Sequence, residues 1–259
     1  MNKILWVTSF NKELYEASGR HLLRSFEATE SEGDFYIGYE NMTDIDPGKA
    51  GTTWFDLDYS DMLQKFLKTY EDAIPEYLGG KAKPCNCSTN PFKKEERFHI
   101  KGCHFTWWNR NASRWFRNFA TLEKALNWAD ESTFICWLDS DCLFKNKVTV
   151  DFITKLFGEN ELLYLRGVRG LLEAGFVGYN NDDILQILFQ LYMSGNFRHL
   201  KRWDDCYALE KVIGSKRFIC KDIATKTHGD FGDVFTHSEI GNYLVHNKGL
   251  HGRKLGLMK

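Results

Sequence analysis

The chain has 259 residues, of which 43% are hydrophobic, and its 34 Lys and Arg nearly balance its 35 Asp and Glu, giving a formal net charge of −1. This balance excludes a polyelectrolyte tail and gives the molecule no overall attraction to nucleic acid or to an anionic membrane. With 15% aromatic residues and only 4 prolines, the composition is typical of one compact globular domain.

The first residues carry no secretory signal pattern. A single lysine precedes a short apolar run at residues 4–7, which becomes polar too early for a signal peptide. No stretch reaches the roughly 20 apolar residues of a membrane span. The seven cysteines are odd in number and mostly scattered, which is typical of reduced thiols. We therefore expect a cytoplasmic protein without a membrane span.

The first third of the chain alternates strand and helix patterns. Residues 4–7 predict a buried strand, and Asn11 can cap a helix whose inner positions recur every four residues from Leu14 to Phe26. A second strand is predicted over residues 34–39, and a helix begins after a Ser60 cap. This order predicts a single α/β domain with a mostly parallel central sheet flanked by helices.

Residues 79–103 are polar, turn-rich and locally basic, so we interpret them as a loop or insertion. An amphipathic helix is predicted over residues 111–129, followed by a continuous apolar run at residues 133–138 that indicates a central buried strand. Further strands and helices are expected up to about residue 223. Residues 228–259 are rich in glycine and histidine and have little apolar periodicity, so we expect an active-site tail without a core element.

Two carboxylates, Asp139 and Asp141, follow the central strand with Ser140 between them. On an extended chain their side chains point to the same side, roughly 6–7 Å apart. Like charges this close to a core are costly unless a cation joins them. Mn²⁺ or Mg²⁺ would accept these oxygens, and a nucleotide diphosphate would complete the coordination. The alternative is that aspartate is simply common where strands meet loops.

This motif at the end of a central strand resembles the Asp-x-Asp motif of GT-A-fold glycosyltransferases, which have a Rossmann-related fold. The resemblance implies a metal-dependent enzyme that moves a sugar from a nucleotide-sugar donor, most often UDP-linked, to a hydroxyl of a glycan or another acceptor. It also implies donor contacts from the end of the first strand, from the helix before the motif and from the motif itself. These candidates are Thr8, Ser9, Phe10, Arg114, Arg117 and Ser140. For each, the alternative is a solvated turn or helix face.

Three acidic residues beyond the motif are candidate catalytic groups. Glu173 precedes a Gly-aromatic run that resembles the acceptor-side strand of the family, where a carboxylate can deprotonate the acceptor hydroxyl. Asp204 and Asp205 resemble the segment at a helix start that lies near the donor sugar. Capping of that helix is the competing explanation for both, because aspartate is a good N-cap.

The tail supplies the remaining site candidates. A late histidine followed by glycine and a basic residue resembles the third metal ligand and phosphate contact of related enzymes. His246 fits the ligand, with Arg253 or Lys254 on the diphosphate and His228 as the second choice. The spacing departs from the family pattern, and a solvated histidine is the alternative.

Two other functional classes remain open. A haloacid dehalogenase-like phosphohydrolase also uses Asp-x-Asp at a strand end, but near the N-terminus rather than at residue 139. A nucleic-acid-binding module is suggested by the basic and aromatic residues of segment 85–117, and modified DNA would then be a conceivable acceptor. In the same region, Cys85, Cys87 and Cys103 have a loose spacing for zinc.

Overall fold

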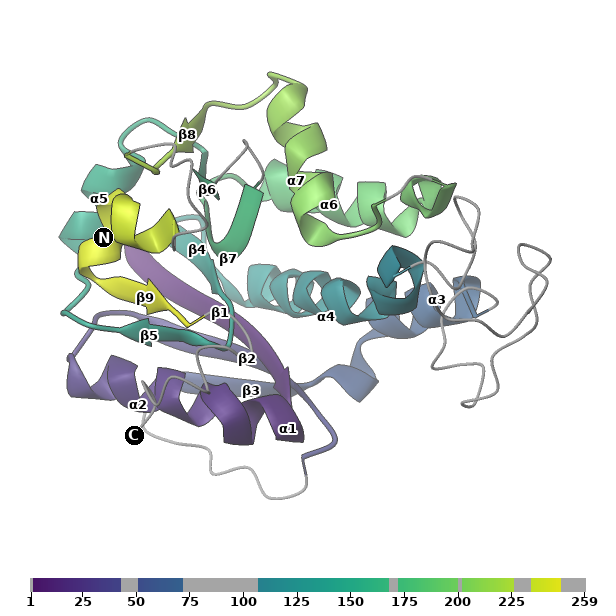
Figure 1. Ribbon diagram of the computed structural model, residues 1–259, viewed down its shortest axis with the longest axis horizontal. Helices are drawn as coiled ribbons and strands as arrows, with labels where there is room; N and C mark the ends of the chain where they lie inside the picture. Colours follow the sequence, from purple (N-terminus) through teal and green to yellow (C-terminus); the bar gives the residue numbers. More distant parts are fainter. Residues whose placement is uncertain are drawn as a thin grey trace.

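The computed structural model describes residues 2–42, 51–71, 107–167, 172–199, 202–225 and 234–247 (Figure 1). Its centre is a seven-stranded sheet in the order β3-β2-β1-β4-β7-β6-β8. Strand β7 runs antiparallel to both of its neighbours, and the other pairs are parallel. The predicted mostly parallel α/β domain is thereby confirmed. The strands are β1 Lys3–Asn11, β2 Asp34–Glu40, β3 Thr52–Asp56, β4 Thr133–Leu138, β6 Leu162–Arg166, β7 Leu172–Tyr179 and β8 Cys220–Asp222.

Strands β1 and β4 lie side by side at the centre of the sheet, with Val7 opposite Trp137. Both are buried along nearly their whole length, as expected for parallel strands covered on two faces. Because they run parallel, their carboxyl ends reach the same edge. This register brings the end of β1, at Ser9, and the motif that follows β4 to one side of the sheet.

The helices begin where the sequence provides caps. The side chain of Asn11 accepts a hydrogen bond from the backbone N–H of Leu14, and that of Ser60 does the same for Leu63, as predicted. The predicted helix over residues 111–129 is the longest of the described helices. The helices are α1 Lys12–Leu14, a π-helical turn Tyr15–Gly19, α2 Arg20–Ala28, α3 Asp61–Thr69, α4 Trp107–Trp128, α5 Val150–Phe157, α6 Asp182–Met193 and α7 Asp205–Gly214.

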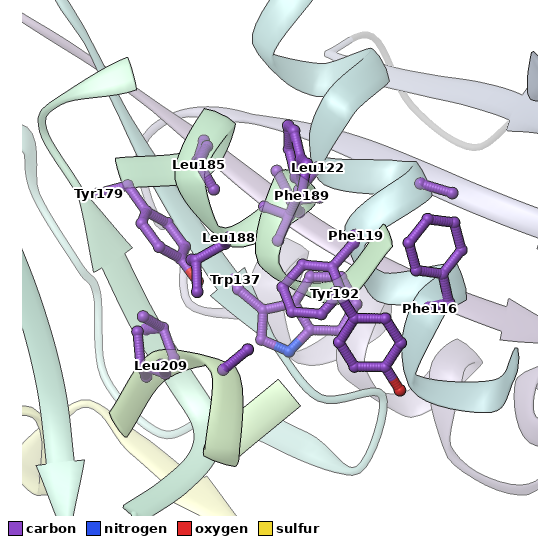
Figure 2. Close-up of a cluster of buried hydrophobic side chains, with 14 of the residues drawn as sticks. Phe116, Phe119, Leu122, Trp137, Tyr179, Leu185, Leu188, Phe189, Tyr192 and Leu209 are labelled. Carbon is purple, nitrogen blue, oxygen red and sulfur yellow. The ribbon is translucent and has the colours of Figure 1, made fainter. Parts of the chain in front are cut away.

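Two apolar clusters cover the two faces of the sheet. On one face, α3, α4, α6 and α7 pack against alternate strand residues such as Trp137, which lies among Phe119, Leu188 and Tyr192 in Figure 2. On the other face, α2 and α5 pack against the intervening residues, including Leu138. No described helix combines the length and apolar character that a membrane crossing requires.

A second, two-stranded sheet lies beside the main one. Strand β5, Cys142–Phe144, pairs antiparallel with β9, Leu244–His246 (Figure 1). The expectation that residues 228–259 form no core element is wrong for the described residues 234–247, because Phe235, Ile240 and Leu244 are buried. Phe235 and Ile240 lie in short 3-10 turns, 234–237 and 239–242, so their spacing produces no helix or strand period.

Candidate metal centre and substrate cleft

Asp139 and Asp141 lie at the carboxyl end of β4, on a tight turn closed by a hydrogen bond from Cys142 N to Asp139 O at 3.0 Å. The backbone N–H of Asp139 donates to Gly175 O at 3.0 Å, which ties the turn to β7. The indole Nε1 of Trp137 donates to Asp139 Oδ1 at 3.1 Å. The orientation of the first carboxylate is therefore fixed by its own strand.

His246 reaches the two aspartates from β9, because the strand register places it opposite Cys142. Its Nε2 lies 3.0 Å from Asp141 Oδ1 and 3.8 Å from Asp139 Oδ2. The backbone N–H of Asn247 also donates to Asp141 O at 3.0 Å. The structure thus brings together the three residues that the sequence suggested as metal ligands.

Glu173, at the start of β7, lies on the other side of the imidazole, with its Oε1 3.7 Å from His246 Nδ1. That Nδ1 is buried and has no hydrogen-bond partner. Close approach of the ring depends on Gly175, where a Cβ would lie 2.8 Å from the imidazole atoms Cε1 and Nδ1. The importance of Gly175 was not evident from the sequence, because a glycine in a strand carries no local signal of what it faces.

The electrostatics of this cluster favour extra protons when no cation is present. Desolvation on the cleft floor raises the pKa of Asp139 to about 7, although the neighbouring His246 acts to lower it. For His246, desolvation favours the neutral ring, but the hydrogen bond with Asp141 and the surrounding carboxylates prevail and raise its pKa to about 9. A divalent ion would replace these protons, since ligands bind metal in their deprotonated forms.

The donor set fits a divalent cation. One oxygen each from Asp139 and Glu173 and one nitrogen from His246 lie within 4.8 Å of one another, and Asp141 and Cys142 form a second such group with the same histidine. The uncoordinated ring nitrogen of a ligating histidine commonly faces a carboxylate, as Nδ1 faces Glu173. The site therefore has both ligands and an outer partner for one of them.

A cleft of about 1140 Å³ opens above this cluster. It runs from the ends of β1 and β4, past the π-helical turn, and along α4. Among the described residues that line it are Ser9, Phe10, Asn11, Glu13, Ser18, Glu40, Arg114, Arg117, Asn118, Asp139, Ser140, Asp141, Glu173, Asp205 and Cys206. Asp139, Asp141 and most of the predicted donor contacts thus share one cavity, and His246 lies buried behind the two aspartates.

The three candidates on β1 have different surroundings. Ser9 lines the cleft, and its hydroxyl donates to Asn118 Oδ1 at 3.2 Å. Phe10 also lines the cleft, with its ring 5.4 Å from that of Tyr15 and 5.7 Å from that of Trp54. Thr8 is buried and does not line the described cleft, and its hydroxyl has no hydrogen-bond partner.

The remaining donor candidates come from α4 and from the motif. Arg114 is exposed and lines the cleft. Arg117 also lines it, but its Nε donates to Glu40 Oε2 at 2.5 Å, so part of its charge is neutralised within the protein. The hydroxyl of Ser140 lies 3.3 Å from that of Ser18, which the π-helical turn directs into the cleft.

The adjacent aspartates at the start of α7 have separate environments. Asp204 is the N-cap, accepts a hydrogen bond from Tyr207 N at 2.9 Å and is bound by the Arg202 guanidinium at 2.9 and 3.0 Å. It does not line the described cleft. Asp205 does, and it accepts a hydrogen bond from Asn118 Nδ2 at 3.1 Å. Burial raises the pKa of Asp205 to about 6, and the charge of Asp204 adds to this rise.

Several predicted residues lie outside the described part of the chain. These are Arg253, Lys254 and His228 of the tail, the loop 79–103, the candidate zinc ligands Cys85, Cys87 and Cys103, and most of the basic segment 85–117. The predictions made for them therefore stay predictions. The cysteines that are described, Cys136, Cys142, Cys206 and Cys220, are free thiols.

No family model matches the sequence, and no curated protein matches it either. Among solved structures, the chain is similar to the glycosyltransferase GlyE of Streptococcus pneumoniae, at 14% identity over 85% of this chain and 45% of that one, with a TM-score of 0.42. It is also similar to mouse xyloside xylosyltransferase 1, at 12% identity over 86% of both chains and a TM-score of 0.46. A third is a glycosyltransferase involved in glycosylation of the major capsid of PBCV-1, at 11% identity over 98% of this chain and 99% of that one, with a TM-score of 0.45.

The chain spans under half the length of GlyE. All three structures are glycosyltransferases by name.

Proposed function

We propose that this chain is a metal-dependent glycosyltransferase that moves a sugar from a nucleotide-sugar donor, UDP-linked, to a hydroxyl of an acceptor. The observation that supports this most directly is that Asp139 and Asp141 line a cleft that also reaches the end of β1, with the buried His246 in contact with Asp141 behind them. In open α/β sheets, ligands bind outside the carboxyl ends of the strands, which is where this cleft lies.

The ligand types support Mn²⁺ over Mg²⁺. Mg²⁺ prefers oxygen ligands and near-ideal octahedral geometry, whereas imidazole nitrogen is an ordinary ligand for transition metals. Asp139, Asp141 and His246 would hold the ion, with Trp137 fixing the first carboxylate. When bound, the ion would neutralise the charge that develops on the leaving diphosphate.

The size of the cleft favours a nucleotide sugar over a small phosphate ester. Pockets for drug-sized ligands measure roughly 300–1,000 Å³, and this cleft is about 1140 Å³. A nucleoside diphosphate with a sugar and part of an acceptor would use this volume, whereas a phosphomonoester would leave much of it empty. The phosphohydrolase alternative is therefore less favoured.

The charges of the cleft wall support a neutral acceptor. Its described lining contains six carboxylates and two arginines, one of which is paired with Glu40. With Asp139 and Asp141 assigned to the cation that would bind the diphosphate, and Glu40 paired with Arg117, the described lining still has three carboxylates against Arg114. This remaining negative charge favours a neutral glycan hydroxyl over modified DNA as the acceptor. The acidic lining residues are Glu13, Glu40, Asp139, Asp141, Glu173 and Asp205.

The remaining predicted residues take roles that follow from their positions. Ser9 and Ser140 offer hydroxyls to the donor, and Arg114 offers a charge to its phosphates. Asp205 is the better candidate for a contact with the sugar, because Asp204 is engaged as a helix cap. Glu173 is positioned either as acceptor base or as the carboxylate that orients His246.

Thermal denaturation of the purified protein tests this function. Mn²⁺ together with UDP, UDP-glucose, UDP-galactose or UDP-xylose should raise the melting temperature, because a ligand at 100 times its Kd adds about 2.7 kcal/mol of stability. EDTA should remove the effect. Asp139→Asn and Asp141→Asn should keep the ligand-free fold and lose the shift, whereas Asp151→Asn, exposed on α5, should behave as wild type. Undiminished Mn²⁺-dependent binding in both motif variants would overturn the proposal.

A further inference from the structure

Asn118 joins three segments of the chain at the wall of the cleft. It lies on α4, one turn after Arg114, and lines the cleft. Its Oδ1 accepts a hydrogen bond from the Ser9 hydroxyl at the end of β1, at 3.2 Å. Its Nδ2 donates to Asp205 Oδ2 at the start of α7, at 3.1 Å. One amide therefore spans two of the groups that would contact the donor.

The orientation of this amide is determined by its partners. Turning the side chain over would place the amide oxygen against the Asp205 carboxylate, where two acceptors would repel each other. In the orientation found, the amide nitrogen donates to the Asp205 carboxylate and the amide oxygen accepts from the Ser9 hydroxyl. Both hydrogen bonds therefore depend on an amide at this position, and no isosteric side chain reproduces them.

The carboxylate of Asp205 is held at both oxygens. The backbone N–H of Cys206 donates to Oδ1 at 2.8 Å, and Asn118 donates to Oδ2. Asp205 also lines a small cavity of about 20 Å³, whose apolar wall includes Trp137, Leu188 and Leu209. Figure 2 shows these three side chains in the apolar cluster. Without Asn118, one charged oxygen would face this wall unpaired, and the carboxylate would have to turn to find another donor.

We infer that Asn118 is a positioning residue: its two hydrogen bonds fix the position of the Asp205 carboxylate on the cleft wall relative to the Ser9 hydroxyl. This inference rests on the proposed transferase function. A donor bound between the two groups then meets both in one geometry. Such positioning affects turnover more than nucleotide binding, because a displacement of about 1 Å of a group near the reacting atoms can lower the rate by about 10²-fold.

The test compares Asn118→Ala, Asn118→Asp, Asp205→Asn and the double variant Asn118→Ala with Asp205→Asn. Turnover is measured with whichever UDP-sugar the wild type uses, and binding of UDP with Mn²⁺ is measured by calorimetry. Alanine is the best helix former, so the α4 variant should fold. Asn127→Ala is the matched control, because Asn127 also lies on α4 and pairs with a carboxylate, Glu123, at an exposed position.

We expect both Asn118 variants to lose kcat by at least about tenfold, with UDP affinity within about threefold of wild type. The double variant should lose no more than Asp205→Asn alone, because the two changes remove one coupled interaction. Its fall in melting temperature should also be smaller than the sum of the two single falls. Asn127→Ala should leave kcat unchanged.

A space-filling role gives a different pattern. Asn118→Asp keeps the volume and the bond from Ser9, so near-normal turnover in that variant with a loss only in Asn118→Ala would overturn the inference. The inference would also be overturned if the fold loss of kcat in the double variant equalled the product of the losses in Asn118→Ala and Asp205→Asn, because the two residues would then act independently. If the wild type turns over no nucleotide sugar, the proposed function fails, and the melting-temperature cycle still decides whether Asn118 and Asp205 are coupled.

Discussion

Replacing Gly175 by alanine tests whether His246 must lie where the structure places it. A Cβ at this position would be 2.8 Å from two imidazole atoms, so the ring would have to move by about 0.6 Å to reach ordinary contact at 3.4 Å. The ring has little room, because the His246 side chain is 3% exposed and Phe235 lies 3.1 Å from the same Cβ. Overpacking of this kind costs about 1–3 kcal/mol. We also expect Mn²⁺ affinity to fall by roughly 10–100-fold, as for other disturbed metal-ligand shells.

Calorimetric titration with Mn²⁺ and urea unfolding of the same samples measure the two effects separately. Gly214→Ala is the matched control, since a Cβ there meets nothing within 4 Å at the end of α7. It should bind Mn²⁺ as the wild type does and gain up to about 1 kcal/mol of stability from the lower entropy of its unfolded chain. A folded Gly175→Ala protein with wild-type Mn²⁺ affinity would refute the argument that His246 is a ligand at this position.

Three further predictions concern the same centre. Glu173→Gln should lower kcat by about 10²-fold with donor affinity unchanged, as the loss of a base requires; a tenfold loss of Mn²⁺ affinity in calorimetry would instead make it the carboxylate that orients His246. In EDTA, His246 stabilises the fold fully below its ordinary pKa of 6.5 and loses that stabilisation as the pH rises through about 9. The raised pKa of Asp139, about 7, acts in the same direction, but its side chain is 36% exposed and solvent screening reduces its share. Denaturant unfolding should therefore show stability falling from pH 6 to 10; the change in the pKa of His246 alone corresponds to on the order of 3 kcal/mol. A rise in stability over this range would contradict the prediction. Removing residues 248–259, which hold the predicted phosphate contacts, should weaken UDP binding about tenfold, or 1.4 kcal/mol, while Mn²⁺ binding persists; unchanged UDP affinity in calorimetry would place those contacts elsewhere.

The parts of the fold that could be predicted are those with local signals. The apolar run of β4 ends directly at Asp139, and the caps at Asn11 and Ser60 precede regular amphipathic patterns. Burial on both faces makes central parallel strands apolar throughout, so their positions and class are visible in the residues themselves. Asp139 and Asp141, the first two proposed metal ligands, could be picked out for the same reason, because they directly follow this strand.

The rest depends on contacts between distant parts of the chain. Asn118 meets Ser9 across 109 residues and Asp205 across 87, and nothing near it in the sequence distinguishes it from a solvated helix residue. Asp204 and Asp205 are adjacent residues of the same type, so the sequence does not distinguish which of them caps the helix. The backbone geometry at the start of α7, together with Arg202, makes Asp204 the cap.

The pairing of β9 with β5 also has a consequence for the timing of synthesis. His246 follows Asp141 by 105 residues, so at roughly 5–20 residues per second it leaves the ribosome about 5–20 s later. During that interval β1, β2 and β4 have all been made and can pair, but the two aspartates lack their imidazole partner. A nascent chain can therefore build most of its parallel sheet before the proposed metal site is complete. In the proposed enzyme, activity would begin with the docking of β9 and not with the folding of the main sheet.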